Sequence, residues 1–229
     1  MGIFLRRGPA PVRMSDLVVE GTIKLNLGGT PWDWLVVHQG LPSAIYDASC
    51  NGTWLLLKDI YEDRQWHSSN VNDYANSTIN SHLNGDFLQL FDPKTRNAIK
   101  QVKIPYVNGT GNSAVSSGAN GLSAKIFLLS GYEVGIGGAR YVPQDGAKLD
   151  YFNQNTGKDS KRIAYLNGST AASWWLRSPY TGNTSNAWYV SSTGYYYYMN
   201  SSNEPDSRGV RPAIILPSDM IVTSDMLAA

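Results

Sequence analysis

The chain contains very little cysteine and almost no excess charge. Cys50 is the single cysteine among 229 residues, so no intramolecular disulfide can form, and we expect folding to be completed in a reducing cytoplasm. The 19 Lys and Arg residues nearly balance the 18 Asp and Glu residues, which leaves a net charge of +1. A phosphate-tracking surface needs a marked basic excess, so we expect no nucleic-acid partner.

Long apolar runs are also missing. The run at residues 3–5 ends at Arg6 and is far shorter than the roughly 7–15 residues of a signal-peptide core. No run approaches the roughly 20 apolar residues of a membrane-spanning helix. We therefore expect neither classical secretion nor membrane insertion, and we expect the six Asn-X-Ser/Thr sequons to stay unglycosylated.

Motifs for catalysis and metal binding are not found in the sequence. His38, His67 and His82 do not have the spacing of a zinc site, and no HExxH, CxxC or GxSxG occurs. The glycine-rich segment at residues 135–140 lacks the spacing of a dinucleotide-binding turn. We therefore predict a protein that is not an enzyme, with no catalytic residues, no metal and no cofactor. His67 is expected in a structural hydrogen bond and Cys50 as a buried thiol.

The first half of the chain carries both strand and helix signals. Residues 1–14 have no periodicity and contain glycine, proline and basic residues, which predicts an extended arm before a domain at residues 15–229. Apolar alternation on either side of Gly28-Gly29 predicts a hairpin, and a later apolar run predicts a strand ending near Lys58.

Residues 68–102 then change to helical spacing, which predicts two or three short helices. Asp92 followed by Pro93 is a typical N-cap and first-turn pair for the last of them.

The second half of the chain reads mostly as strands and loops. Residues 107–121 are predicted to be a loop too polar to pack, residues 124–130 a buried strand, and residues 131–159 a glycine-rich loop. The closing third predicts four short strands joined by turns, at "ASWWLRSP", "NAWYVSS", "GYYYYMN" and "RGVRPAIILP". We therefore expect an α+β fold with short helices in the first half and a mostly antiparallel closing sheet.

Residues 180–207 hold six of the fourteen tyrosines. Tyrosine offers a large amphipathic contact at low entropic cost, and Ser, Asn and Gly adapt hydrogen bonds, so this composition favours ligand binding. Aromatic faces also stack on sugar rings, which makes a glycan as suitable a ligand as a protein. The alternative is that strands favour tyrosine in any case, with Tyr195 and Tyr197 on one face and Tyr196 and Tyr198 on the other.

Several other aromatic and basic residues of the closing third are predicted to be structural. Alternation places Val190 toward the core, which favours packing over ligand contact for Trp188. A further set is assigned to the framework, its arginines needing a paired carboxylate or carbonyls when buried. This set comprises Trp174, Trp175, Arg177 and Arg211.

Two motifs carry a family resemblance: "SWWLRSP" at residues 173–179 and "RGVRPAIILP" at residues 208–217. With "VVHQG", "YDASCNGTWLL" and "RQWHSSNVNDYANSTI" they are similar to a large family of uncharacterised domains of gut bacteria and their prophages. The likeness covers nearly the whole chain from Val18 onward. The Trp-rich strand, polar insert and terminal Gly-Val-Arg strand resemble the C-type-lectin-like fold in its formylglycine-generating-enzyme variant. That enzyme depends on cysteine pairs, so its activity is not carried over.

The resemblance implies a function for the tyrosines. Phage and bacterial proteins diversified by retroelements carry hypervariable residues on the closing strands of such a fold. Adenine-directed mutagenesis yields mainly Asn, Tyr, Ser and Asp, which fill 17 of the 28 positions at residues 180–207. The residues expected to contact a ligand are Tyr180, Asn183, Ser185, Asn186, Tyr189, Ser191, Tyr195, Tyr196, Tyr197, Tyr198, Asn200, Ser201 and Asn203.

The function expected from these features is that of a phage virion surface protein at a tail tip, fibre or capsid. It would assemble in the host cytoplasm, bind a host-surface glycan or protein, and contact other virion proteins through the arm at residues 1–14. A homotrimer is one arrangement that would add avidity. The alternatives are a purely structural decoration or scaffold protein of the virion, a bacterial surface adhesin, and an enzyme of unknown chemistry.

Overall fold

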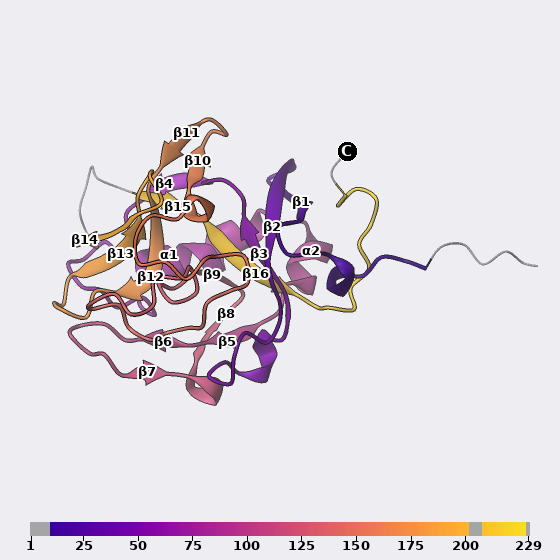
Figure 1. Ribbon diagram of the computed structural model, residues 1–229. Coiled ribbons are helices and arrows are strands. Elements are labelled where there is room, and N and C mark those ends of the chain that lie inside the picture. The colour runs from indigo at the N-terminus through magenta and orange to yellow at the C-terminus, as the bar shows by residue number, and fades with distance from the viewer. Residues whose placement is uncertain (1–9, 202–207, 228–229) are drawn as a thin grey trace, which may run out of the picture.

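Figure 1 shows the computed structural model, which describes residues 10–201 and 208–227. Its first sheet has five antiparallel strands in the order β1-β2-β3-β16-β9. Their bounds are Thr22–Leu27 for β1, Thr30–Gly40 for β2, Gly52–Leu57 for β3, Ile126–Leu128 for β9 and Pro212–Leu216 for β16. The predicted hairpin and the predicted strands near Lys58 and within residues 124–130 are confirmed.

The second sheet also has five strands, in the order β14-β13-β12-β15-β4. All its neighbours are antiparallel except β12 and β15, which run parallel with Trp174 opposite Gly209. The bounds are Glu62–Arg64 for β4, Trp174–Pro179 for β12, Asn186–Val190 for β13, Tyr196–Asn200 for β14 and Arg208–Val210 for β15. A mostly antiparallel closing sheet is therefore confirmed, with one parallel pair that the sequence did not suggest.

Short helices and hairpins cover the two sheets (Figure 1). Three helical segments fall where helices were predicted: α1 (Thr78–His82), the π-helical turn η3 (Leu83–Phe87) and α2 (Pro93–Ala98). Single 3₁₀ turns are η1 (Met14–Asp16), η2 (Ala48–Cys50), η4 (Gly118–Asn120) and η5 (Ser160–Arg162). The hairpins are β5 (Val102–Ile104) with β8 (Leu122–Ala124), β6 (Tyr106–Val107) with β7 (Val115–Ser116), and β10 (Ala164–Leu166) with β11 (Thr170–Ala172).

Local chemistry explains the predicted turns. Gly28 and Gly29 both have positive φ, 58° and 83°, as a tight hairpin turn requires. The Asp92 carboxylate accepts hydrogen bonds from the backbone amides of Lys94 and Thr95, which confirms it as the N-cap of α2.

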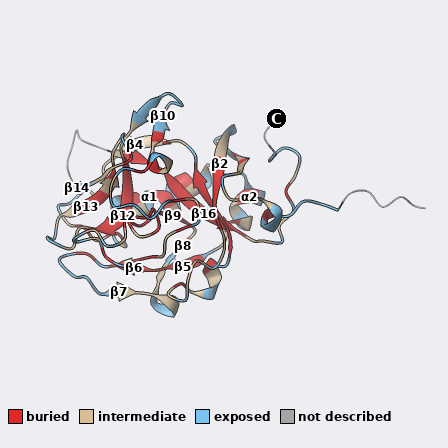
Figure 2. Cartoon of the chain, in the orientation of Figure 1, coloured by how far each residue is buried: buried red, intermediate tan, exposed pale blue. Residues whose placement is uncertain are grey.

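The apolar core lies on both faces of the central strands. On β3, Leu55 and Leu57 belong to one cluster of buried side chains, whereas Trp54 and Leu56 belong to a second cluster on the opposite face. All six residues of β12 are buried as well. Figure 2 shows these central strands in red beneath paler outer elements. Strands buried on both faces read as continuous apolar runs, which is how "WWL" and "AIIL" appear in the sequence.

Two expectations need correction. The segment "RGVRPAIILP" is two strands in different sheets, because the chain crosses from β15 to β16 at Arg211. Residues 107–121 are not wholly a loop, since β7 and η4 lie within them. The last residue of the predicted arm, Met14, is fully buried, and its backbone amide donates to the Met220 carbonyl. Residues 1–9 lie outside the described part of the chain.

The α+β class is confirmed as a strand-rich fold with few, short helices. No helix in the described ranges has the length and apolar character needed to cross a membrane.

Candidate ligand-binding face

The tyrosine-rich segment forms an antiparallel hairpin at an edge of the second sheet. Strands β13 and β14 pair in an unbroken register from Asn186 opposite Asn200 to Val190 opposite Tyr196. Gly194 closes the turn with φ of 76°, and a side chain there would meet the Asp159 carbonyl oxygen at 2.2 Å. The turn therefore requires glycine, and β14 is held at the end of the strand order.

Tyr196, Tyr197 and Tyr198 alternate between the two faces of this hairpin, as predicted, but Tyr195 precedes β14 and stacks on Tyr196 with ring centroids 4.9 Å apart, so the predicted separation of these two is wrong. Tyr197 lies near Tyr189, with ring centroids 5.9 Å apart, and near Tyr195 at 5.2 Å. Tyr196 and Tyr198 instead lie on the face of Trp188. The side chains of Tyr197 and Tyr198 are 50% and 47% exposed, which is unusual for large aromatic residues.

A stack of rings joins Tyr180 to this hairpin. Tyr180 and Tyr198 stack with centroids 3.9 Å apart, and Tyr141 lies 5.0 Å from Tyr180. The Trp188 indole is only 3% exposed and donates to the Tyr141 carbonyl, so the prediction that Trp188 packs is confirmed. We call Tyr180, Tyr189 and residues 195–198 the tyrosine edge. Tyr141, itself 36% exposed, was missed because only tertiary contact brings it there.

Asn72 fixes the backbone beside the tyrosine edge. This buried side chain donates to the carbonyls of Tyr180, Asn183 and Asn186 at 2.8–3.1 Å. Its own carbonyl oxygen accepts from the Thr110 amide. The loop between β12 and β13 is therefore ordered before any ligand arrives, which reduces the entropic cost of binding.

Not every predicted contact residue is available to a ligand. Ser201 is fully buried and its hydroxyl donates to the Val71 carbonyl at 2.8 Å, so the prediction that it contacts a ligand is wrong. The Asn183 side-chain oxygen accepts from the amides of Ser185 and Asn186 and shapes the loop. Asn203 lies outside the described residues. The remaining predicted polar residues, Ser185, Asn186, Ser191 and Asn200, are half-buried beside the tyrosine edge.

Burial agrees with the framework prediction for Trp174 and Trp175, which are fully buried, and for Arg177, which is 1% exposed. Arg211 is 2% exposed, but it also lines a pocket. Trp174 donates its indole N–H to the Arg162 carbonyl, and Trp175 donates to the Arg64 carbonyl. The strand β12 is thereby locked to η5 on one side and to β4 on the other.

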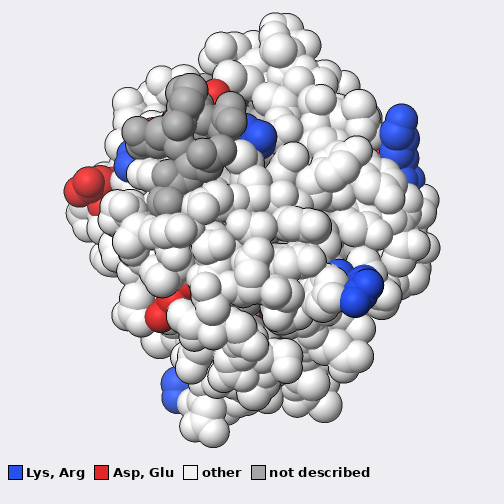
Figure 3. All heavy atoms as spheres, turned by 90° about the vertical axis from the view of Figure 1, so that its left-hand side faces the viewer, with Lys and Arg blue, Asp and Glu red and all other residues white. Residues whose placement is uncertain are grey.

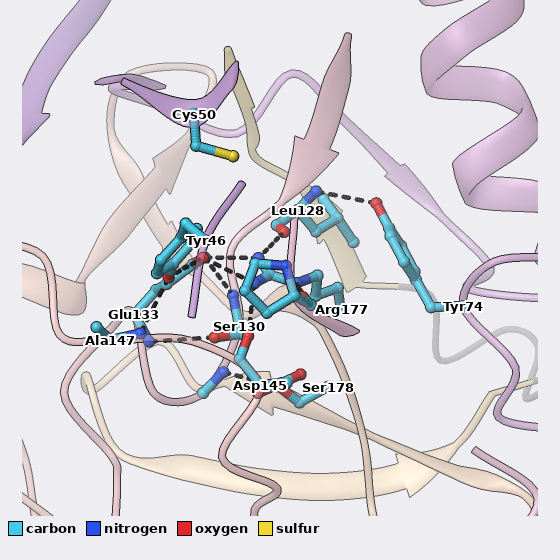
Figure 4. Close-up of polar contacts among 12 residues, drawn as sticks. Tyr46, Cys50, Tyr74, Leu128, Ser130, Glu133, Asp145, Ala147, Arg177 and Ser178 are labelled. Atoms are coloured by element: carbon cyan, nitrogen blue, oxygen red, sulfur yellow. Dashed lines mark hydrogen bonds and ion pairs between the residues drawn. The ribbon is translucent and has the colours of Figure 1, made fainter. Parts of the chain in front are cut away.

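Arg177 sits in a fully buried polar cluster (Figure 4). Its guanidinium donates to both carboxylate oxygens of Glu133 at 2.6 and 2.7 Å. It also donates to three backbone carbonyls, those of Pro105, Leu128 and Asp145. Tyr46 completes the arrangement by donating to Glu133 at 2.8 Å, and burial raises the pKa of Tyr46 well above its usual value. Every donor of Arg177 is thus used within the protein.

Two further members of this buried region have shifted pKa values. Burial raises the pKa of Asp145 to about 6, even though the Ser178 hydroxyl donates to its carboxylate. Burial also raises the pKa of the Cys50 thiol to about 11. Cys50 is therefore a protonated thiol at neutral pH, in agreement with its predicted structural role. His67, with Nε2 3.2 Å from the Ser69 hydroxyl, makes the structural hydrogen bond expected of it.

Charge is sparse on the side of the molecule that carries β13 and β14. Figure 3 shows isolated blue and red patches separated by broad uncharged surface. Within the described ranges no group of three or more His, Cys, Asp or Glu residues is arranged to hold a metal ion. The charges near the tyrosine edge include Arg208, 4.9 Å from the Tyr189 ring centroid, so aromatic contact and hydrogen bonds would act there beside a cation.

The chain belongs to the family described as domain of unknown function DUF6273, which matches residues 51–218. The match covers β3 to β16 and includes the tyrosine edge and both Arg177 and Glu133, but not Tyr46. No curated protein and no solved structure matches the chain. Family membership therefore defines the class of domain and assigns no activity to it.

Proposed function

We propose that this protein is a ligand-binding module that contacts a glycan or a protein through its tyrosine edge. The observation that carries the proposal is the exposure of Tyr197 and Tyr198, about half of each residue, beside a β12–β13 loop that Asn72 holds in place. Such rings provide large contact area with few rotatable bonds, and an ordered loop lowers the entropy lost on binding.

The resemblance to C-type-lectin-like domains supports a specific setting for this activity. In that setting the protein is displayed on a phage particle and binds a host-surface glycan or protein, with the β13–β14 hairpin as its diversified surface. Binding without catalysis agrees with a buried Cys50 whose thiol stays protonated. Several copies on one particle, for example as a homotrimer, would compensate for a weak single site. A structural virion protein or a bacterial adhesin are the competing functions.

The proposal is tested by screening the purified chain on a glycan array and on intact candidate host cells. Tyr197→Ala and Tyr198→Ala are each expected to weaken binding at least about tenfold, because exposed aromatic anchors dominate such interfaces. Leu41→Ala is the control, since Leu41 is also exposed, at 39%, and lies just after β2, outside the tyrosine edge. Loss of binding in Leu41→Ala alone would reject the tyrosine edge as the site.

The diversification proposal has a separate test at the level of DNA. Sequencing the coding region across its source population should show substitutions concentrated at adenines within the codons for residues 180–207. The codons of "WWLRSP" and "GVRP" should remain fixed. Scattered, mostly synonymous changes would remove the support for diversification and favour the structural virion protein.

A further inference from the structure

A pocket of about 300 Å³ lies away from the tyrosine edge, between the first sheet, η5 and β10. Its size is at the low end of the range for small-molecule sites. Apolar and aromatic side chains form its walls, and two cations and one carboxylate line it. The lining residues are Leu35, Lys58, Asp59, Tyr151, Ser160, Ile163, Tyr165 and Arg211.

Arg211 is the unusual member of this set. Only 2% of Arg211 is exposed, and its guanidinium carbon lies 4.9 Å from the centroid of the Trp174 ring. Its Nε donates to the Leu57 carbonyl at 2.9 Å, but Nη1 has no hydrogen-bond partner among the residues that the structure describes. No carboxylate in the described ranges forms an ion pair with it. A buried charge without a paired carboxylate is costly, and Arg211 lines a pocket in which an anion can lie.

The other buried arginines show that this fold normally satisfies such groups. Arg177 is paired with Glu133, and Arg162 donates to backbone carbonyls, including those of Val134 and Gly157. Burial lowers the pKa of Arg211 to about 10, and the nearby Tyr151 and Asp59 offset that effect only in part; burial lowers the pKa of Arg162 as well. Arg211 is still charged at neutral pH.

The remaining charges at the pocket favour an anion. Lys58 and Arg211 supply two positive charges and Asp59 one negative charge, which leaves a lining charge of +1. Lys58 is half-exposed and lies 3.5 Å from Asp33, so it can turn toward a ligand at the pocket mouth. Tyr151 and Tyr165 provide ring faces on which an apolar or sugar-like body can lie.

We propose that this pocket binds a small molecule carrying an oxyanion, a carboxylate or a phosphate, which pairs with Arg211 while its body lies against Tyr151 and Tyr165. The oxyanion supplies the negative charge that no carboxylate among the described residues provides for Arg211. The pocket shares no residue with the tyrosine edge, so variants can test the two sites separately.

The test is isothermal titration of the full chain with three probes: inorganic phosphate, glucuronate and uncharged glucose. Phosphate or glucuronate is expected to bind and glucose is not, and the tighter of the two anions identifies the group that the pocket prefers. Arg211→Gln is expected to weaken anion binding at least about tenfold, since a charged hydrogen bond is lost. Asp59→Asn is expected to tighten it, because a repulsive charge is removed. This second variant keeps the test valid if Arg211→Gln does not fold.

Lys94→Gln is the control, since it removes one positive charge from an exposed position on α2. It should leave anion binding unchanged. The proposal is overturned if neither anion binds, if Lys94→Gln weakens binding as much as Arg211→Gln, or if Asp59→Asn has no effect. Unchanged anion binding in Tyr197→Ala would show that this pocket and the tyrosine edge act separately.

Discussion

Arg177 and Arg211 come from the two framework motifs of the same domain, and both are almost fully buried. Arg177 is surrounded by acceptors: burial disfavours its charge, but the Glu133 carboxylate outweighs that effect and raises its pKa. Arg211 has one backbone acceptor and an aromatic ring, and burial lowers its pKa. All donors of Arg177 are therefore satisfied within the protein. Arg211 lines a pocket, and its Nη1 atom has no hydrogen-bond partner among the described residues.

The difference in partners distinguishes a structural arginine from a binding arginine, which the sequence motifs alone do not. Breaking a buried pair leaves an uncompensated charge, so a satisfied arginine is expected to matter mainly for stability. An arginine that already lacks a partner has less to lose in the free protein and more to gain from a ligand. Measurements on each region can therefore test the distinction directly.

The largest effect is expected from Arg177→Met. This change leaves Glu133 buried and unpaired, so we expect the free energy of unfolding to fall by about 3–5 kcal/mol. Urea denaturation followed by tryptophan fluorescence would measure it. Arg64→Met is the control, since its ion pair with Glu62 is partly exposed and should contribute under about 1 kcal/mol. Equal losses in both variants would contradict a special role for the buried pair.

Asp145, next to Arg177, should make stability depend on pH. Burial raises its pKa to about 6, so between about pH 4 and 6 the folded protein keeps a proton that the unfolded chain has released. Its contribution to the free energy of unfolding therefore falls as pH rises through this window, by on the order of 2 kcal/mol. Unfolding of the natural chain and of Asp145→Asn, compared from pH 4 to 7, isolates this contribution. A difference between them that does not change with pH would refute the assignment.

Gly146 shows how tightly the Arg177 region is closed. A Cβ atom at this position would lie 2.6 Å from the Ser130 hydroxyl oxygen and 2.9 Å from the Tyr46 hydroxyl. We expect Gly146→Ala to cost about 1–3 kcal/mol through overpacking, measured as a lower melting temperature. Gly85→Ala is the matched control, because nothing lies within 4 Å of its Cβ position and a helical turn favours alanine. An unchanged melting temperature in Gly146→Ala would contradict this, because Ser130 and Tyr46 could then move aside to accept the added methyl group.

Much of the fold could be predicted because its signals are local. The glycines of the β1–β2 turn and the Asp92 cap act within a few residues, so they are visible in the sequence. The crossing of the chain at Arg211 from β15 in the second sheet to β16 in the first was not predictable. The apolar run of residues 212–216 indicates a buried strand but not its partner strands. The parallel pairing of β12 with β15 is hidden for the same reason.

The candidate sites show the same limit. Alternation correctly placed Tyr197 on the face opposite Tyr196 and Tyr198, but the burial of Ser201 depends on Val71, which is 130 positions away. Glu133 could not be named as the partner of Arg177, since a buried arginine needs some acceptor and the sequence offers many. The pocket at Arg211 escaped notice because Leu35, Tyr151 and Tyr165 meet there only after folding.

The smallest effect on stability is expected from Arg211→Met, and it is the sharpest test of the comparison. The variant loses the hydrogen bond to the Leu57 carbonyl and the contact with the Trp174 ring, but it also removes a buried charge that has no paired carboxylate among the described residues. These terms nearly cancel, so we expect a change within about 1 kcal/mol by urea denaturation. Anion binding should be lost in the same variant. A loss of stability equal to that of Arg177→Met would instead make Arg211 a structural residue, because its charge would then be stabilised by the protein alone.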